Sequence, residues 1–332
     1  MLNLYGIQKN VIKPQNNMIS KTNFRTIGSL VIMLFLFNSC DKGDSPVDSE
    51  SKTPETTNPE TQTPPPAVTT NLSIESSNTF GVLKLSQDDF KYWNSHTINE
   101  TATVEKLKTL CKTEIYPVLK DDFDFIVIVL NNATSTPPTG MPYGIYQSVK
   151  NDTQGIGLSL FDSTKDYGSA GKLQGVYFLY LNNIQGGPIL HEMFHRWANY
   201  AVPQDYVYHW DKVKGILSGV SNNIADIELY LAGAIPASEI KDAESLAIYN
   251  DPRFTNKTRI PNSTNSQKSF KSLLVVMNPT TLTDTEIKSY KDQIANVTRT
   301  PAQGVTTGYQ NLYNKSRGLL TLTIGNLDKS KK

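Results

Sequence analysis

The chain of 332 residues is 38% hydrophobic and contains 16 Tyr, 12 Phe and 3 Trp, enough for a sizeable packed core. Its formal net charge is only +1 and the charges are scattered, so we expect no nucleic-acid partner. The only cysteines are Cys40 and Cys111, which excludes a disulfide framework and a Cys-rich metal site.

The N-terminal segment has the pattern of an export signal. Residues 27–37 form a mostly apolar run that follows two basic residues and ends shortly before Cys40. The run is too short to span a bilayer with such flanks and is typical of a signal peptide. A small residue followed by cysteine resembles the cleavage site of bacterial lipoproteins, which implies a lipidated Cys40. We expect a signal peptide over 1–39, with Met18 as an alternative start; an uncleaved membrane anchor is the other interpretation.

The segment after the predicted lipidation site has the composition of a tether. Residues 41–70 hold 6 prolines, 7 threonines and 6 acidic residues, with no large apolar side chain. Such a segment cannot bury enough surface to fold, so we predict a disordered tether over 40–72. Acidic residues directly after the cysteine resemble the export signal of surface lipoproteins in Gram-negative bacteria. This resemblance implies a lipid anchor at the outer membrane, with the protein exposed on the cell surface.

Periodic apolar residues predict one folded, monomeric domain over 73–328. Three- and four-residue spacing places Cys111 on the buried face of a helix, as a core thiol. Helices are expected over 104–119, 188–200, 224–234 and 285–297. Strands are expected over 123–130, 144–150, 155–161, 173–181, 272–277 and 319–324. Because helices and strands are mixed without strict alternation, we predict the α+β class with a mixed sheet.

The helix expected over 188–200 carries an HExxH motif. On a helix, His191 and His195 lie on one face, so both imidazoles can bind one Zn²⁺. Glu192 is then placed as the general base toward a zinc-activated water molecule. The opposite face is apolar and is expected to pack on the core; it consists of Leu190, Met193, Phe194 and Trp197.

A catalytic zinc usually has a third protein ligand, for which two candidates follow the motif. Glu228 lies in the helix expected over 224–234. His209 lies in an aromatic stretch between the HExxH motif and that helix. We favour Glu228, since a second helix holds a ligand rigidly; Asp226 is a weaker alternative. In the opposite assignment His209 is the ligand and Glu228 orients its imidazole.

Other polar residues are candidates for binding substrate or stabilising an oxyanion. With Glu228 as the ligand, His209 would line the cleft and donate a hydrogen bond, and Tyr206, Tyr208 and Tyr230 are further candidate donors. Residues 151–152 are expected in a turn between strands or in a loop near the cleft.

Several sequence blocks together resemble a poorly characterised family of bacterial secreted zincin-like metallopeptidases. The resemblance covers roughly 120–325, and the blocks are VKND at 149–152, GIG at 155–157, YGSAGKLQGV at 167–176, HEMFHRW at 191–197, HW at 209–210 and ELYLAG at 228–233. It implies a zincin-like catalytic domain in which His209 and Glu228 matter.

The sequence therefore predicts a cell-surface lipoprotein zinc metallopeptidase that hydrolyses peptide bonds, as an endopeptidase, in protein or peptide substrates. In such enzymes the substrate pairs with the edge strand beside the active helix. Residues 173–181 belong to that sheet, and which strand forms its edge is open. Two alternatives remain: a non-catalytic surface binding module on the same scaffold, and a zinc hydrolase of a non-peptide bond.

Overall fold

The structure is a computed structural model that describes residues 70–199, 201, 215–218, 223–254, 257–304 and 310–328. The chain divides into two units, residues 1–63 and 64–332, and every described residue belongs to the second. The predicted signal peptide, Cys40 and nearly all of the tether lie outside the described residues, as do Tyr206, Tyr208 and His209.

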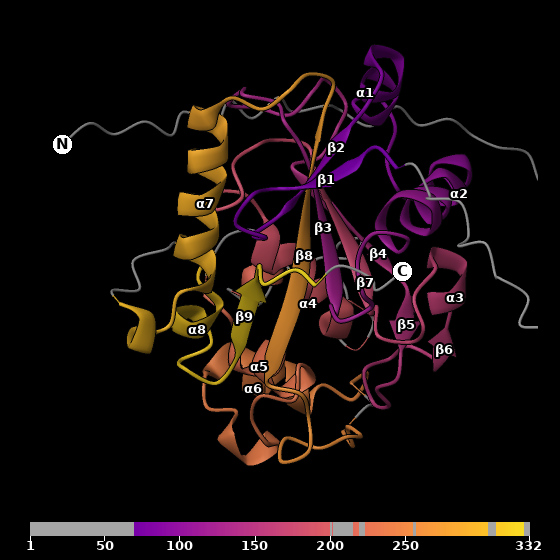
Figure 1. The fold of residues 1–332 in the computed structure, drawn as a ribbon. Coiled ribbons are helices and arrows are strands. Elements are labelled where there is room, and N and C mark those ends of the chain that lie inside the picture. Colours follow the sequence, from indigo (N-terminus) through magenta and orange to yellow (C-terminus); the bar gives the residue numbers. More distant parts are fainter. Residues whose placement is uncertain are drawn as a thin grey trace, which may run out of the picture. The chain divides into compact units, whose positions relative to one another are not determined.

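Strands and helices of the second unit are distributed along the whole described sequence (Figure 1). The strands are β1 (Leu72–Ile74), β2 (Gly81–Lys84), β3 (Phe125–Leu130), β4 (Gly144–Ser148), β5 (Lys150–Asn151), β6 (Phe161–Asp162), β7 (Gly175–Leu179), β8 (Ser269–Asn278) and β9 (Thr321–Ile324). The α-helices are α1 (Gln87–Trp93), α2 (Thr101–Leu110), α3 (Thr164–Tyr167), α4 (Ile189–Ala198), α5 (Asp226–Leu231), α6 (Ala243–Asn250), α7 (Asp284–Thr298) and α8 (Leu312–Lys315). Short turns of other helix types are η1 (Cys111–Ile115), η2 (Ile216–Ser218), η3 (Ala237–Glu239) and η4 (Pro301–Gln303).

A mixed sheet forms the centre of this unit. Its strand order is β1-β2-β8-β3-β7-β4, and β9 also pairs with β8. The inner pairs β2–β8, β8–β3 and β3–β7 are parallel, whereas β1 and β4 add antiparallel strands at the two ends. Strands β5 and β6 form a separate antiparallel pair. The mixed sheet and the irregular alternation of elements confirm the α+β class.

Both faces of the sheet are covered, which explains why its inner strands are apolar throughout. In β3, Val127 points into one core and Ile128 into the other, because successive side chains of a strand alternate between faces. Helices α4, α5, α7 and α8 cover the first face, and α1, α2 and α3 cover the second (Figure 1).

Local backbone geometry corrects two sequence-based expectations. The strand expected over 155–161 is wrong: only β6 forms at its end, and Gly155 adopts a positive φ of 76°. A Cβ at Gly155 would lie 2.2 Å from the carbonyl oxygen of Thr258, so a tight loop replaces the strand. The helix expected over 104–119 continues beyond α2 as the π-turn η1, where Cys111 is fully buried as predicted.

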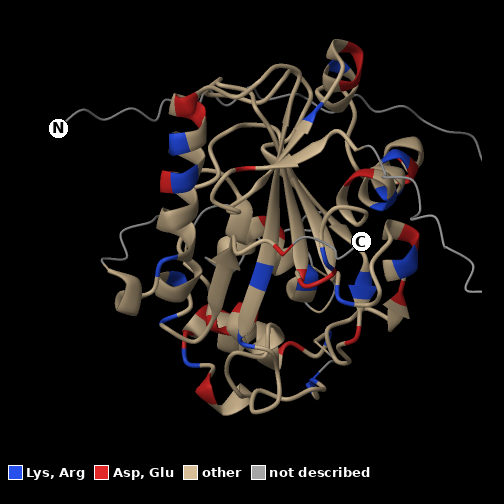
Figure 2. Cartoon of the chain, in the orientation of Figure 1, with Lys and Arg blue, Asp and Glu red and all other residues tan. Residues whose placement is uncertain are grey.

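Charged side chains of both signs are interspersed along the outer helices, for example on α7 and α2 (Figure 2). Within the described residues, no helix combines the length and the apolar character needed to cross a bilayer.

Candidate metal centre

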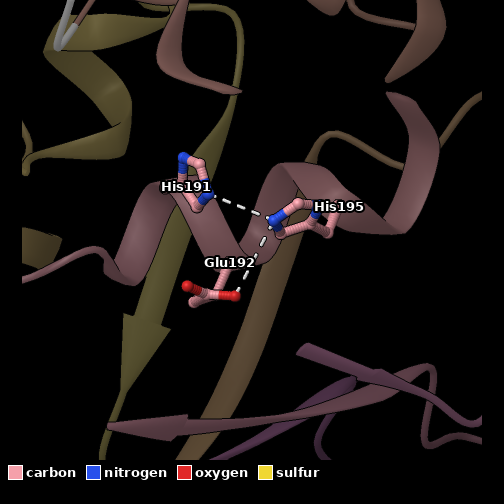
Figure 3. A group of neighbouring side chains, drawn as sticks. All are labelled: His191, Glu192 and His195. Carbon is pink, nitrogen blue, oxygen red and sulfur yellow. Dashed lines mark hydrogen bonds and ion pairs between the residues drawn. The ribbon is translucent and has the colours of Figure 1, made fainter. Parts of the chain in front are cut away.

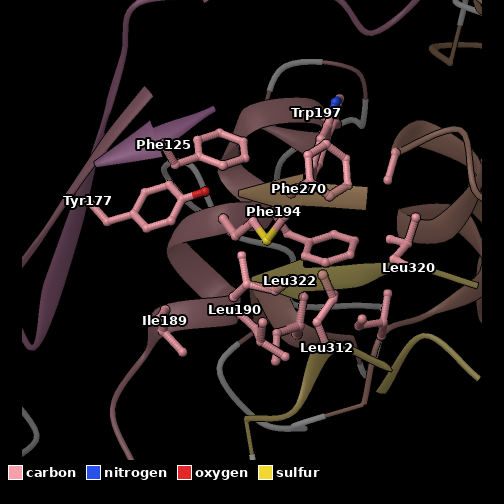
Figure 4. Packing of buried hydrophobic residues seen from close by; sticks show 14 of the residues in the cluster. Phe125, Tyr177, Ile189, Leu190, Phe194, Trp197, Phe270, Leu312, Leu320 and Leu322 are labelled. Carbon is pink, nitrogen blue, oxygen red and sulfur yellow. The ribbon is translucent and has the colours of Figure 1, made fainter. Parts of the chain in front are cut away.

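Helix α4 carries the candidate site, and its apolar face is anchored in the core as the sequence predicts. Pro188 occupies the N-cap, and the next residue, Ile189, begins the helix. Four side chains of the apolar face are buried against the sheet and the C-terminal elements (Figure 4); they are Leu190, Met193, Phe194 and Trp197. This packing fixes the rotation of α4 about its axis and therefore the direction of its histidines.

The two histidines of the motif face each other through their Nε2 atoms, which lie 3.1 Å apart (Figure 3). Each ring is held from its other nitrogen. His191 donates from Nδ1 to the backbone carbonyl of Ile216 at 2.9 Å, and the Nδ1 of His195 lies 2.6 Å from Oδ1 of Asn199. Since both partners are oxygen acceptors, each neutral ring carries its proton on Nδ1 and its lone pair on Nε2.

This arrangement fits a divalent cation. Two imidazole nitrogens bound to one tetrahedral zinc at about 2.1 Å lie about 3.4 Å apart, near the 3.1 Å between the Nε2 atoms of His191 and His195. Of the described residues, His191, Glu192 and His195 are those that can offer ligand atoms within 4.8 Å of one another.

Glu192, which directly follows His191 in the helix, is the third member of the group formed with His191 and His195. Its side chain is buried, and its Oε2 lies 3.9 Å from Nε2 of His195. Burial raises the pKa of Glu192 to about 8, because a low-polarity environment disfavours the carboxylate. A Cβ at Gly144, the first residue of β4, would lie 2.8 Å from Oε1 of Glu192. The absence of a side chain at Gly144 therefore makes room for this carboxylate against the edge of the sheet.

Glu228 is not brought into the histidine group. It is fully buried in α5, and its oxygens accept hydrogen bonds from the backbone amides of Ile216, Leu217 and Ala225 at 2.9, 2.8 and 2.7 Å. Burial raises the pKa of Glu228 to about 7, and the three amide donors oppose this rise. In this arrangement the carboxylate holds the turn η2 instead of pointing at the metal position.

The other sequence-predicted residues are placed away from the group or lie outside the described residues. Asp226 accepts from the backbone amides of Lys241 and Asp242 and pairs with Arg317 at 2.7 Å. Tyr230 donates its hydroxyl to the carbonyl of Lys257 at 2.8 Å, which commits it to that loop. His209 and Tyr208 fall in a part of the chain that is not described.

Arg196 was not predicted as part of the site, although it follows His195 directly. Its buried guanidinium donates to the side chains of Asn151, Asp152 and Gln174 at 3.0, 3.0 and 3.3 Å. The loop after β5 is thereby attached to α4 beside the second histidine. The only sequence signals were a charged residue on a helix with a buried face and the polar pair at 151–152.

The strand next to α4 is the end strand of the sheet. β4 pairs antiparallel with β7 on one side, and the sheet order ends there. Tyr146 of β4 lies with its ring nearly parallel to that of His195, at 6.4 Å between ring centroids. The edge of the sheet and the histidine pair are therefore neighbours.

Comparison of the chain with protein-family models, with curated proteins and with solved structures gives no match, so the resemblance to zincin-like metallopeptidases stays a prediction and the site is interpreted from its own geometry.

Proposed function

We propose that this protein is a zinc metallopeptidase whose ion is held by His191 and His195. The observation that carries the proposal is the facing pair of Nε2 atoms, 3.1 Å apart, with both Nδ1 atoms bound to oxygen acceptors. Imidazole nitrogens are common ligands of zinc, and a hydrogen bond donated by Nδ1 places the lone pair on Nε2, the nitrogen that would coordinate the ion. The third ligand is either His209 or Glu228, and the amide contacts of Glu228 favour His209.

The chemistry follows from Glu192 beside the two imidazoles. A bound zinc ion supplies Lewis acidity that polarises a substrate carbonyl and lowers the pKa of water to about 7. Glu192 accepts a proton from the attacking water at its carboxylate and delivers it to the amide nitrogen that leaves as the C–N bond breaks. Its place beside both imidazoles, with Oε2 3.9 Å from Nε2 of His195, suits both transfers.

The position of β4 supports a peptide as the substrate. An extended peptide can add to the free edge of a sheet through backbone hydrogen bonds, independently of its side chains. β4 is the end strand of the sheet, and Gly144 at its start lies against Glu192. A peptide added along β4 would thus run past the carboxylate, as cleavage within a chain requires.

We further propose that the protein acts as a monomer at the outer surface of a Gram-negative bacterium. The support is the sequence alone: the signal pattern over 1–39, the cysteine at its end and the tether composition over 40–72. Lipid attached to Cys40 would hold the catalytic unit at the membrane, where exposed proteins are within reach.

Zinc content and the Glu192→Gln variant test the proposal together. The purified full chain should contain about one zinc per molecule, and His191→Ala or His195→Ala should lose both zinc and cleavage of a peptide library. Glu192→Gln should retain zinc, because the histidines are untouched, and lose at least about 10²–10⁴-fold in rate because an amide cannot accept the proton.

Each measurement has a result that counts against the proposal. Absence of zinc after supplementation would exclude the metal site. Stoichiometric zinc without cleavage of any peptide would point to a binding module or to hydrolysis of another bond. Wild-type cleavage rates in Glu192→Gln would show that this residue is not the base.

A further inference from the structure

The two histidines of α4 are held in different ways. His195 is held within its own helix, because Asn199 lies four residues further along the chain. His191 depends on a remote segment: its Nδ1 donates to the carbonyl oxygen of Ile216 in η2. The position of that carbonyl group therefore contributes to the orientation of the His191 ring.

Glu228 fixes the same peptide group from its other side. The amide between Ile216 and Leu217 contributes the carbonyl that His191 binds and the N–H that Glu228 binds through Oε1 at 2.8 Å. One peptide plane thus connects the carboxylate to the imidazole. Hydrogen bonds at both ends of an amide polarise it and strengthen each other, so the carboxylate makes the Ile216 carbonyl a better acceptor.

The remaining contacts of Glu228 hold this arrangement rigid. Its Oε2 accepts from the amides of Ile216 and Ala225, so both oxygens are engaged by the backbone. The contact with Ala225 spans the N-cap of α5, where Glu228 occupies the N3 position that often reaches back to the cap. At the neighbouring turn, a Cβ on Gly215 would lie 2.5 Å from Oε2, so the chain passes too close for any side chain.

We propose that Glu228 is a positioning residue that acts on His191 through the Ile216–Leu217 peptide group, and not a ligand of the metal. It holds the proton of His191 on Nδ1 and thereby presents Nε2 to the ion. A carboxylate that hydrogen-bonds a ligating histidine is a common outer partner in zinc sites. Here a backbone amide is inserted between the two groups. The inference rests on the proposed zinc site only for its effect on metal affinity.

The first variant is Glu228→Gln in the full chain. A glutamine offers one acceptor oxygen and directs its NH₂ group at backbone N–H donors, so the contacts to η2 cannot all be kept. We expect zinc affinity, measured by competition with a chelator, to fall about 10–100-fold. The matched control is Asp226→Asn, a buried carboxylate of the same helix that binds amides of 241–242 instead of η2, and it should retain wild-type zinc affinity.

A second variant removes the relay without touching Glu228. Replacing Leu217 by its α-hydroxy acid converts one amide to an ester, which deletes the N–H at Oε1 and weakens the Ile216 carbonyl as an acceptor. This variant should reproduce the loss of zinc affinity seen with Glu228→Gln. It decides the question if Glu228→Gln does not fold.

The decisive readout is the tautomer of His191 in the metal-free protein, measured by ¹⁵N NMR of labelled histidine at pH 8. In the wild type, the proton of His191 should reside on Nδ1, and in both variants part of it should move to Nε2. His195 is the internal control, since its Asn199 contact is unchanged. If the wild-type chain bound no zinc, the proposed function would fail while this comparison would still test the relay.

Two results would overturn the inference. One is an unchanged His191 tautomer together with wild-type zinc affinity in the folded variants. The other is complete loss of zinc in Glu228→Gln with wild-type affinity in the ester variant, which would make Glu228 a direct ligand.

Discussion

Gly144 shows how a single missing side chain shapes the site. A Cβ added there would approach the ring of Pro188 at 2.7 Å, Oε1 of Glu192 at 2.8 Å and Leu179 at 2.9 Å. All three distances are shorter than ordinary contacts between carbon and its neighbours. The start of β4, the N-cap of α4 and the carboxylate are thus packed at their closest possible approach.

Gly144→Ala should therefore displace the Glu192 side chain. We expect a lower kcat on peptides with zinc content unchanged, and a loss of about 1–3 kcal/mol in the free energy of unfolding from overpacking. Gly81→Ala is the matched control, because its Cβ would meet only the movable end of Leu72 at 2.9 Å, far along the sheet from α4. Equal loss of activity in both variants would contradict a specific effect on Glu192.

At the scale of elements, α4 is held by two independent attachments. Its apolar face packs on the sheet, and Arg196 attaches the loop after β5 to the face beside His195. The guanidinium is buried, and Asp152 is about half exposed at 52% of its side chain, so the pair forms at the boundary between core and solvent. Burial tends to raise the pKa of Asp152, but Lys150 and Arg196 hold it below its ordinary value.

Arg196→Met keeps an unbranched apolar stem and removes the five N–H donors of the guanidinium. Asn151 and Gln174 would then lose a buried partner, so we expect a loss of about 2–4 kcal/mol in the free energy of unfolding, measured in urea. Lys288→Met provides the contrast, since the Lys288–Asp292 pair is exposed and should contribute less than about 1 kcal/mol. Similar losses of unfolding free energy in both variants would contradict a special structural role for Arg196.

The sequence predicts α4 well because its signals are local. The histidine spacing and the apolar face, including Phe194, follow directly from the helical repeat. The placement of Glu228 could not be predicted, since its partners are backbone amides, and any residue type supplies these. The expected strand over 155–161 failed for a related reason, because the positive φ of Gly155 depends on the loop at 258 that packs against it.

At the scale of the whole unit, an ion pair between a buried carboxylate and a partly exposed lysine connects the N-terminal hairpin to α7. Glu75, just after β1, accepts from Lys291 at 2.6 Å and from Ser76 and Ser77. Burial alone would raise the pKa of Glu75, but Lys291 and the serine donors outweigh it and lower the pKa to about 2. The ionised form of Glu75 is therefore stabilised only in the folded protein.

This shift has a definite pH dependence. Because the folded pKa is lower than the unfolded value of about 4.5, the contribution is complete above pH 5 and is lost as the pH falls toward 2, by at most about 3 kcal/mol. Glu75→Gln should lower the free energy of unfolding at pH 7 and flatten its decline in acid, measured by urea titrations from pH 7 to 2.5. If the free energy of unfolding fell in parallel in wild type and variant as the pH was lowered, the stabilising role of ionised Glu75 would be contradicted.

The proposed membrane attachment of the molecule would depend on one atom, the thiol sulfur of Cys40. Cys40→Ser, expressed in a Gram-negative host, should remove lipid attachment and shift the protein to a soluble or unprocessed form, as detected by fractionation of membranes. Cys111→Ser is the control, since that thiol is buried in the core and should leave attachment unchanged. Unaltered processing of Cys40→Ser would refute the lipoprotein assignment.

The central position of strand β8 determines when the sheet can form during synthesis of the chain. It pairs with β2, β3 and β9, and the pair formed by Gly81 of β2 and Val275 of β8 joins segments that are far apart in the sequence. During synthesis from the N-terminus, β2 and β3 are therefore complete long before β8, the strand that pairs with both of them, has been made. Long-range pairing of this kind is slow to form, and it leaves one side of β2 and one side of β3 without a partner strand until late in synthesis. Truncation before β8 would separate β2 from β3 and leave the β1–β2 hairpin without its connection to the rest of the sheet.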